Sequence, residues 1–551
     1  MQLRLFLVWV CVAVTPVARL AAQVNVLTYH NDRSRTGQNL AETILTPSNV
    51  NSTTFGKLFL TTLDGKVDAQ PLYVGGLLIP NQGTHNVLIV ATENDSLYAL
   101  DADSGATLWH VSLLETGETP SDDRDCSQVT PQIGITSTPV ISLKSATAGG
   151  IIYAVAMSKD ASGNYHQRLH ALSLTTGAEM LGGPANIQAK FPSTGEINSG
   201  GYIFFEPKQY KERSGLLLLN GQVYLGRASH CDDQPYTGWV MAYSATTLAQ
   251  TAVLNVTPNG SEGAIWGAGA GFAADSSGNI YFLDANGTFD TTLSSQGFPV
   301  NGNYGNAFIK LVVADNQLAL SDYFTMYNTV AESDSDTDLG SGGALVLPDM
   351  TNARGAVMHL AIGAGKDSNI YLVDRDNMGK FNPQNNSNVY QELTGALARG
   401  IWSMPAYYNG MVYFGAVTNS IMAFQFSQAL LVSTPASITS HQFPYPGATP
   451  SISANGATNG ILWAVENASP LAVLHAYPAN NLATELYNST QAPNGRDQFG
   501  PGNKFMTPTI ANGKVYVGTP TGVAAFGILA GGVCRSCRLD ATGPGTSTAR
   551  H

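Results

Sequence analysis

Short runs of alternating apolar and polar residues, separated by glycine and asparagine turns, recur along almost the whole chain. Each unit contains a β-branched or aromatic run, a turn, and a second run centred on an aromatic residue. The eight central aromatic residues are Tyr98, Tyr153, Tyr224, Tyr281, Tyr371, Tyr413, Trp463 and Tyr516. An Asn-Gly or Ser-Gly pair before an alternating run favours a β-hairpin, because such turns need positive φ angles. The pattern therefore predicts an all-β chain built from repeated antiparallel sheets.

Stacking of these sheets predicts a β-propeller. A sheet of about four strands cannot bury both faces alone, and radial stacking into a closed ring leaves only short edges exposed. Eight units between Thr61 and Leu529 predict eight four-stranded antiparallel blades. The 90-residue gap between Tyr281 and Tyr371 leaves seven blades as the alternative. We expect residues 55–63 to close the ring by pairing with the unit around Tyr516.

The first residues resemble an export signal rather than part of the fold. Arg4 precedes an unbroken apolar run over residues 5–14, Pro16 breaks the segment, and Leu20-Ala21-Ala22 offers small residues for cleavage. The run is shorter than the roughly 20 residues of a membrane span, and no later stretch is long enough. We predict a signal peptide at 1–22, a lead-in at 23–54, one propeller domain at 55–529 and a C-terminal tail at 530–551. The alternative for the first segment is an uncleaved anchor.

Four cysteines remain after the predicted signal. Cys126 and Cys231 either form a disulfide in an oxidising compartment or stay two separate thiols. Cys534 and Cys537 form a CxxC pair, but Arg538 follows where haem attachment needs histidine, and zinc needs four ligands. Haem and zinc are therefore not expected at the CxxC pair.

Charge narrows the range of partners. The chain carries 27 Lys and Arg against 39 Asp and Glu, a net charge of −12, and only 12% of its residues are charged. Electrostatic binding of nucleic acid needs clustered basic residues, so this class of partner is not expected. An acidic, sparsely charged surface suits protein or carbohydrate partners instead, and we expect a monomer.

A second repeat points to a known family. Residues 99–109, ALDADSGATLW, fit the pattern AxDxx[TS]GxxxW, and partial copies begin at Ala171, Ala242 and Ala476. The pattern resembles the tryptophan-docking repeat of the quinoprotein, or PQQ-like, β-propellers. Further stretches are similar to signature segments of exported bacterial PQQ-like repeat proteins: HNDRSRTG from His30, SHCD from Ser229, GNIY from Gly278, NGTFD from Asn286, DLGSGG from Asp338 and VDRDNMG from Val373. The resemblance implies fold and export more than chemistry.

Dehydrogenases of that family hold PQQ near the propeller axis with Ca²⁺, an aspartate base and a stacking tryptophan. Many also have adjacent cysteines beside the quinone, which this sequence lacks. No motif assigns the family's aspartate or calcium ligands to positions here. Trp266 and Trp402 are the candidate cofactor-stacking residues, and the alternative is that each packs between blades.

An acidic loop is the candidate ion site. Asp334, Asp336 and Asp338 alternate before Gly340, and alternate acidic residues in a loop can turn oxygens onto one calcium ion. Leu339 stands where an EF-hand loop needs glycine, and no glutamate occupies its twelfth position. The alternative is a solvated acidic loop.

Two classes of function remain. The sequence favours a non-catalytic binding or scaffold protein without PQQ, acting through long face loops at 182–211 and 322–343, because the dehydrogenase hallmarks are missing. The alternative is a periplasmic PQQ- and calcium-dependent dehydrogenase of an alcohol or sugar. Acidic residues around a tryptophan at the axis would favour the dehydrogenase, whereas a plugged channel would favour the scaffold.

Overall fold

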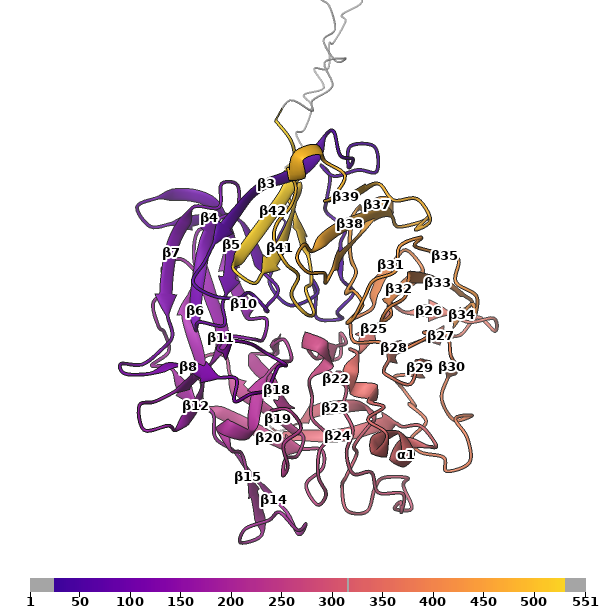
Figure 1. The fold of residues 1–551 in the computed structure, drawn as a ribbon. Coiled ribbons are helices and arrows are strands. Elements are labelled where there is room, and N and C mark those ends of the chain that lie inside the picture. Colours follow the sequence, from indigo (N-terminus) through magenta and orange to yellow (C-terminus); the bar gives the residue numbers. More distant parts are fainter. Residues whose placement is uncertain (1–23, 315–316, 531–551) are drawn as a thin grey trace, which may run out of the picture.

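The computed structural model describes residues 24–314 and 317–530. Within them the strands form eight antiparallel blades around one axis, so the main prediction of eight rather than seven blades is confirmed (Figure 1). The predicted signal peptide, nearly all of the tail, and the CxxC pair at Cys534 lie outside the described residues. No helix in the described part of the chain is long and apolar enough to cross a membrane.

Each blade has an inner, a second, a third and an outer strand. The inner strands are β4 (Leu72–Ile79), β10 (Val140–Ser145), β17 (Leu217–Leu219), β21 (Ala273–Ala274), β25 (Leu345–Val346), β31 (Ala406–Tyr408), β36 (Ser451–Asn455) and β40 (Thr509–Ala511). The second strands are β5 (Gly83–Ala91), β11 (Gly149–Lys159), β18 (Gln222–Ser229), β22 (Ile280–Leu283), β28 (Leu360–Ala364), β32 (Met411–Gly415), β37 (Thr458–Glu466) and β41 (Lys514–Thr519).

The third strands are β6 (Ser96–Asp101), β12 (Tyr165–Ser173), β19 (Trp239–Ser244), β23 (Phe308–Ala314), β29 (Ile370–Asp374), β33 (Ile421–Ser427), β38 (Val473–Pro478) and β42 (Gly522–Ile528). The outer strands are β7 (Thr107–Ser112), β13 (Ala185–Asn186), β20 (Gln250–Asn255), β24 (Gln317–Phe324), β30 (Gln391–Leu393), β34 (Leu430–Leu431) with β35 (Ser437–Ile438), β39 (Tyr487–Asn488) and β3 (Phe55–Thr62).

The remaining elements lie in the lead-in and in the loops. They are the strands β1 (Asn25–Val26), β2 (Gln38–Asn39), β8 (Thr119–Asp122), β9 (Gln132–Ile133), β14 (Lys190–Pro192), β15 (Tyr202–Phe204), β16 (Tyr210–Glu212), β26 (Met350–Thr351) and β27 (Val357–Met358), the helix α1 (Thr329–Asp334), and the 3-10 turns η1 (Pro207–Gln209), η2 (Gly267–Gly269), η3 (Leu339–Ser341) and η4 (Pro493–Gly495).

The ring closes as predicted from the sequence. β3, from the start of the propeller, pairs antiparallel with β42, so that Phe55 faces Ile528 and Thr62 faces Gly522. Figure 1 shows this indigo strand beside the yellow final blade. The last blade therefore takes its outer strand from the N-terminal part of the chain.

The repeated tyrosines dock one blade on the next. Tyr413 on β32 donates its hydroxyl to the carbonyl of Ala479 in the following blade at 2.9 Å, and Tyr516 on β41 donates to Ala102 at the same distance. Tyr153 on β11 donates in the same way to the carbonyl of Ala245. A buried phenol needs such a partner, so the repeat encodes both burial and blade spacing. Tyr98 and Tyr371 differ, because they lie on the third strands β6 and β29 rather than on second strands.

The tryptophan of the second repeat also docks on a neighbouring blade, as expected. The indole nitrogen of Trp109 donates to the carbonyl of Leu174 at 3.3 Å. A Cβ on Gly177 would lie only 2.8 Å from the Trp109 ring, and the φ angle of Gly177 is +72°. Glycine is therefore required at position 177 for two reasons: the turn needs a positive φ angle, and the Trp109 ring leaves no room for a Cβ.

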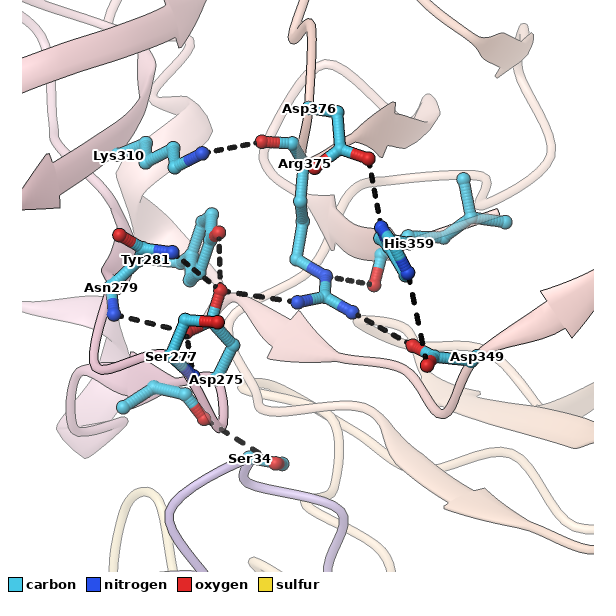
Figure 2. Close-up of polar contacts among 12 residues, drawn as sticks. Ser34, Asp275, Ser277, Asn279, Tyr281, Lys310, Asp349, His359, Arg375 and Asp376 are labelled. Atoms are coloured by element: carbon cyan, nitrogen blue, oxygen red, sulfur yellow. Dashed lines mark hydrogen bonds and ion pairs between the residues drawn. The ribbon is translucent and has the colours of Figure 1, made fainter. Parts of the chain in front are cut away.

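A polar network joins blades 4 and 5 (Figure 2). Arg375, just after β29, reaches the Asp275 carboxylate of the preceding blade at 3.1 Å and Asp349 at 3.4 Å. Tyr281 donates its hydroxyl to Asp275 at 2.9 Å, and His359 lies 2.8 Å from Asp376. Asp275 is largely buried, so this pairing fixes the two sheets in one register.

The lead-in occupies the axial channel and bonds to every blade. Strands β1 and β2 pair with β4 and β36, and Arg35 donates to the carbonyl of Leu216 at 3.2 Å. The remaining contacts are Leu27 O with Ile141 N (2.8 Å), Arg33 O with Ala274 N (2.7 Å), Ser34 O with Val346 N (3.0 Å), Thr36 O with Tyr407 N (2.8 Å) and Asn39 Nδ2 with Ile510 O (3.0 Å). The channel is therefore plugged by the segment that precedes the propeller.

Candidate functional site

The antiparallel order of the strands sorts the connections onto two faces. The turns between second and third strands share one face with the linkers that join successive blades; we call it the linker face. The other turns, including the network around Arg375, lie on the opposite face. Side chains from linkers far apart in the sequence can therefore meet at the axis on the linker face.

Four linkers meet directly above the lead-in. Gly215 N donates to Gly269 O at 3.2 Å, and a Cβ on Gly215 would lie 3.0 Å from Tyr29 Cβ. A Cβ on Gly343 would lie 2.3 Å from the Met404 sulfur. These glycines allow the linker backbones to pack closely and form the base of the site.

Trp266, the first predicted cofactor residue, lies at this base. It immediately precedes η2 and is partly buried. Its ring meets Phe505 edge-to-face at 6.2 Å, and the Arg213 guanidinium lies 4.6 Å from the Phe505 ring centre. An aromatic surface beside a cation is thus available near the axis.

Asp338, from the predicted ion loop, forms an ion pair beside this surface. It immediately precedes η3, which contacts η2. Lys366 Nζ lies 2.6 Å from Asp338 Oδ2, and Asn286 N donates to Asp338 Oδ1 at 2.8 Å. Burial raises the pKa of the Asp338 carboxyl and Lys366 opposes part of the rise. Burial alone would lower the pKa of Lys366, but Asp338 outweighs it and the net shift is upward.

Trp402, the second predicted cofactor residue, lies beside the same lysine. Lys366 Nζ is 5.8 Å from the Trp402 ring centre, and the Trp402 ring meets Tyr445 at 6.2 Å. Lys504 lies 5.7 Å from the Tyr445 ring centre, and Lys504 is the neighbour of Phe505 in the chain. These residues therefore form a series of neighbours that runs from Trp266 through Tyr445 to Asp338.

Acidic residues of blade 1 face the same region. Lys66 Nζ lies 2.9 Å from Asp68, and Arg213 Nη1 lies 4.0 Å from it. Burial alone would raise the pKa of Asp68, but Lys66 and Arg213 outweigh it and lower the pKa to about 2. Burial and the Asp68 charge raise the pKa of Glu93 well above its usual value. Glu93 is therefore held protonated next to an ionised aspartate.

Several buried polar atoms at this site lack a hydrogen-bond partner among the described residues. They are Glu93 Oε1, Ser137 Oγ, Arg213 Nη1 and Asn286 Oδ1. Native proteins leave few such groups unpaired, because each costs about 1–3 kcal/mol. A polar ligand on the linker face would give these four atoms partners.

A cleft opens beside these residues on the linker face. Its volume is about 550 Å³, within the usual range for small-molecule sites. It is lined by Lys66, Glu93, Gln128, Gln132, Asn503 and Lys504 among others. Cys126 and Cys231 form a disulfide, one of the two alternatives left open by the sequence, and it ties the linker that borders the cleft to blade 3.

The structure brings together only part of the predicted ion loop. The ligand atoms of Asp334, Asp336 and Asp338 do not all lie within 4.8 Å of one another. Asp334 ends α1 and is exposed, whereas Lys366 lies 2.6 Å from both Asp336 and Asp338. A protein cation thus neutralises two of the three carboxylates.

The sequence did not identify most residues of this series. They come from four different connections, and no local motif marks them: Lys66, Asp68, Arg213, Lys366, Lys504 and Phe505. The available signal was positional: each lies in a linker or in a second-to-third-strand turn, which share one face once the chain is divided into blades. Asn286 lies in a stretch that carried the family resemblance.

Comparisons with known proteins agree on the fold. No protein-family model matches the chain, and no curated protein matches it either. A quinohemoprotein alcohol dehydrogenase from Comamonas testosteroni is 14% identical, with a TM-score of 0.59 over 92% of this chain and 80% of that one. A quinohemoprotein alcohol dehydrogenase from Pseudomonas putida HK5 is 15% identical, with a TM-score of 0.60 over 95% and 82%. A europium-containing methanol dehydrogenase is 12% identical, with a TM-score of 0.58 over 91% and 98%. The chain therefore has the quinoprotein type of β-propeller fold.

Proposed function

We propose that the protein is a PQQ-dependent dehydrogenase of an alcohol or sugar, with its cofactor on the linker face. The observation that carries the proposal is the position of Trp266 and Asp338, which precede two contacting 3-10 turns at the axis. The plugged channel, taken alone, is the feature expected of the scaffold function. Acidic residues around a tryptophan favour the dehydrogenase over the scaffold function.

The side chains present fit PQQ, which is a planar aromatic tricarboxylate. Trp266 offers an aromatic face, and Lys66, Arg213, Lys366 and Lys504 offer cations around it. The unpaired Arg213 Nη1 and Ser137 Oγ would gain acceptors from a carboxylate. Asp68 pairs with Lys66 and Asp338 with Lys366, so Lys504 and the unpaired Arg213 Nη1 are the groups that would attract an anionic ligand.

A calcium ion fits the same site in part. Asn286 Oδ1 is unpaired, and an amide oxygen is a ligand type that calcium accepts. Calcium takes about six to eight oxygens, so the cofactor and water would complete the set. Asn286, rather than the 334–338 loop, is the proposed protein ligand, because both oxygens of Asp338 are already paired with Lys366 and Asn286 N.

Bound PQQ would supply an acceptor for the two electrons of an alcohol carbon–hydrogen bond. The protein's contribution is to bind and orient substrate and to accept the hydroxyl proton at a carboxylate oxygen of Asp338. Lys366 favours the ionised form of Asp338, which is the form that can accept a proton. Trp402 and Tyr445 border the approach and would exclude water from the reacting groups.

We propose further that the protein is exported and monomeric. The predicted signal at 1–22 and the Cys126–Cys231 disulfide support an oxidising compartment. The neighbouring cleft of about 550 Å³ has room for a small alcohol or a sugar.

The test compares Asp338→Asn with Asp334→Asn after incubation with PQQ and Ca²⁺. Asp338→Asn should keep retained quinone within about twofold but lose about 10²–10⁴ of its alcohol- or sugar-dependent dye reduction, the usual contribution of a general base. The exposed Asp334→Asn variant should match the wild type. Absence of substrate-dependent turnover in the wild type, or full activity in Asp338→Asn, would overturn the proposal.

A further inference from the structure

A second cluster of ligand-bearing side chains lies between blades 6 and 7, and Asn467, next to its Glu466, donates to Tyr445 O at 3.2 Å. His441 comes from the linker after β35, Glu466 ends β37, and His475 lies on β38. One ligand atom from each lies within 4.8 Å of the other two. The linker and two strands of one blade thus converge on a single point.

The two imidazoles face the same carboxylate oxygen. His441 Nε2 lies 3.0 Å and His475 Nε2 lies 3.3 Å from Glu466 Oε2. The rings are stacked, with centres 4.6 Å apart and planes inclined at 24°. Tetrahedral zinc with bonds of 2.0–2.2 Å separates its ligand atoms by about 3.3 Å. The observed spacing already matches that separation.

The other nitrogen of His475 is held by a carboxylate. His475 Nδ1 lies 2.6 Å from Glu485 Oε1, and Glu485 also accepts from Tyr477 at 3.0 Å and from Asn488 at 2.7 Å. A proton on Nδ1 leaves the lone pair of Nε2 directed at Glu466. Ligating histidines are usually oriented in this way by an outer carboxylate.

One polar atom of the cluster is buried without a hydrogen bond. His441 Nε2 is shielded from solvent, and its approach to Glu466 does not have hydrogen-bond geometry. Phe443, which is fully buried, packs edge-on against both histidine rings at 5.0 and 5.1 Å. The rings are therefore fixed in place. His441 Nε2 still lacks a hydrogen-bond partner, whereas His475 Nε2 is hydrogen-bonded to Glu466 Oε2 at 3.3 Å.

We propose that His441, Glu466 and His475 bind one divalent transition metal ion of the zinc type. Two imidazole nitrogens and one carboxylate oxygen suit zinc better than calcium or magnesium, which take oxygen ligands. Three protein ligands leave one position for water on the side where His441 is partly exposed. The ion would cross-link the linker between blades 6 and 7 to the sheet of blade 7. This site is independent of the proposed PQQ function.

The test measures zinc bound to the full protein, purified without a histidine tag. The protein is stripped with a chelator, dialysed against Zn²⁺ with excess Ca²⁺ to fill oxygen-rich sites, and assayed for metal by mass spectrometry. We expect one zinc ion per wild-type chain. His441→Asn should bind at least about 100-fold more weakly, because loss of an outer-shell partner alone costs 10–100-fold.

The control is His359→Asn, which removes a similarly exposed histidine that also contacts two carboxylates on the opposite face (Figure 2). It should bind zinc like the wild type. Glu485→Gln should weaken binding 10–100-fold without removing a ligand. Absence of bound zinc in the wild type would mean that a proton on His475 alone satisfies the cluster, and would overturn the proposal. Unchanged binding in His441→Asn would overturn it equally.

Discussion

Lys366 shows how one side chain decides what an acidic loop can do. The sequence pattern of Asp334, Asp336 and Asp338 predicts a calcium loop, because the three carboxylates alternate. Lys366 arrives from the next blade, neutralises two of them, and leaves Asp338 facing the axis. The lysine is 28 positions from Asp338 in the chain. Only the packing of blade 5 on blade 4 brings it there, so local pattern alone overlooks it.

Glu93 allows a pH-dependent prediction at the same scale. In the unfolded chain its carboxyl ionises near pH 4.3, whereas in the folded protein burial and Asp68 keep it protonated to much higher pH. The folded state then binds the extra proton, so stability falls as pH rises above about 4.3. The Glu93→Gln substitution removes this loss of stability, because glutamine has no carboxyl group to ionise. Its gain in unfolding free energy should be smallest at pH 4 and should increase with pH, by at most about 1.4 kcal/mol per pH unit, as long as the folded protein keeps the proton.

Guanidinium unfolding midpoints between pH 4 and pH 8 check the Glu93 prediction. The exposed Glu196→Gln variant is the matched control and should show no pH-dependent difference from the wild type. A Glu93→Gln difference that stays constant with pH would contradict the buried, protonated state of Glu93.

At the scale of elements, the strands were more predictable than the lead-in. The aromatic repeat predicts most of the second strands because these side chains must be buried, and Tyr153, Tyr413 and Tyr516 also donate to the next blade. The same rule assigns Tyr371 to a second strand, although it lies on the third strand β29, because second and third strands share the same pattern of an aromatic residue in an alternating run beside a turn. The lead-in at 23–54 shows no repeat. Its path along the axis depends largely on hydrogen bonds between backbone carbonyl groups and inner-strand amides. Every sequence has these backbone groups, so they leave no pattern from which the path could be predicted.

Arg35 is the residue that holds the lead-in together. It is fully buried and donates to Thr28 Oγ1 at 2.7 Å, to Tyr29 O at 2.7 Å and to Phe272 O at 2.8 Å. Arg35→Met should lower the unfolding free energy by about 3 kcal/mol or more, because hydrogen bonds to charged groups contribute about 1.5–3 kcal/mol each. Denaturant unfolding measures the loss.

The neighbouring Arg33 provides the comparison, since its side chain is exposed. Arg33→Met should change stability by no more than about 0.5 kcal/mol. Hydrogen exchange at the amides of Ala274 and Val346, which bond to the lead-in, should accelerate in Arg35→Met alone. Equal effects of the two variants would contradict the role given to Arg35.

At the scale of the whole molecule, ring closure explains why the fold could be predicted and the site could not. Repeats and the closing strand are readable along the chain, and both are confirmed. Site residues such as Asp68, Arg213 and Lys504 meet only after eight blades have closed. Each of them looks like an ordinary loop charge in the sequence, so their convergence is a property of the closed ring.

The disulfide is a second long-range constraint on the whole ring. Cys126 and Cys231 are separated by 105 residues, and a crosslink over such a loop stabilises by about 2–4 kcal/mol. The double variant Cys126→Ser, Cys231→Ser should lose that amount in denaturant unfolding under oxidising conditions. Wild-type protein unfolded with reductant should match the variant. Unchanged stability in the double variant would contradict a structural role for the crosslink.

The central claim is that the linker face holds a quinone against Trp266, and the most direct measurement is PQQ binding with Ca²⁺ present. We expect one quinone per chain after removal of free cofactor, with quenched tryptophan fluorescence. Trp266→Leu should weaken retention at least about tenfold, whereas Trp109→Leu, which alters a blade contact remote from the axis, should retain quinone like the wild type. Failure of the wild type to retain PQQ, or equal retention in Trp266→Leu, would contradict the account and favour a cofactor-free binding protein.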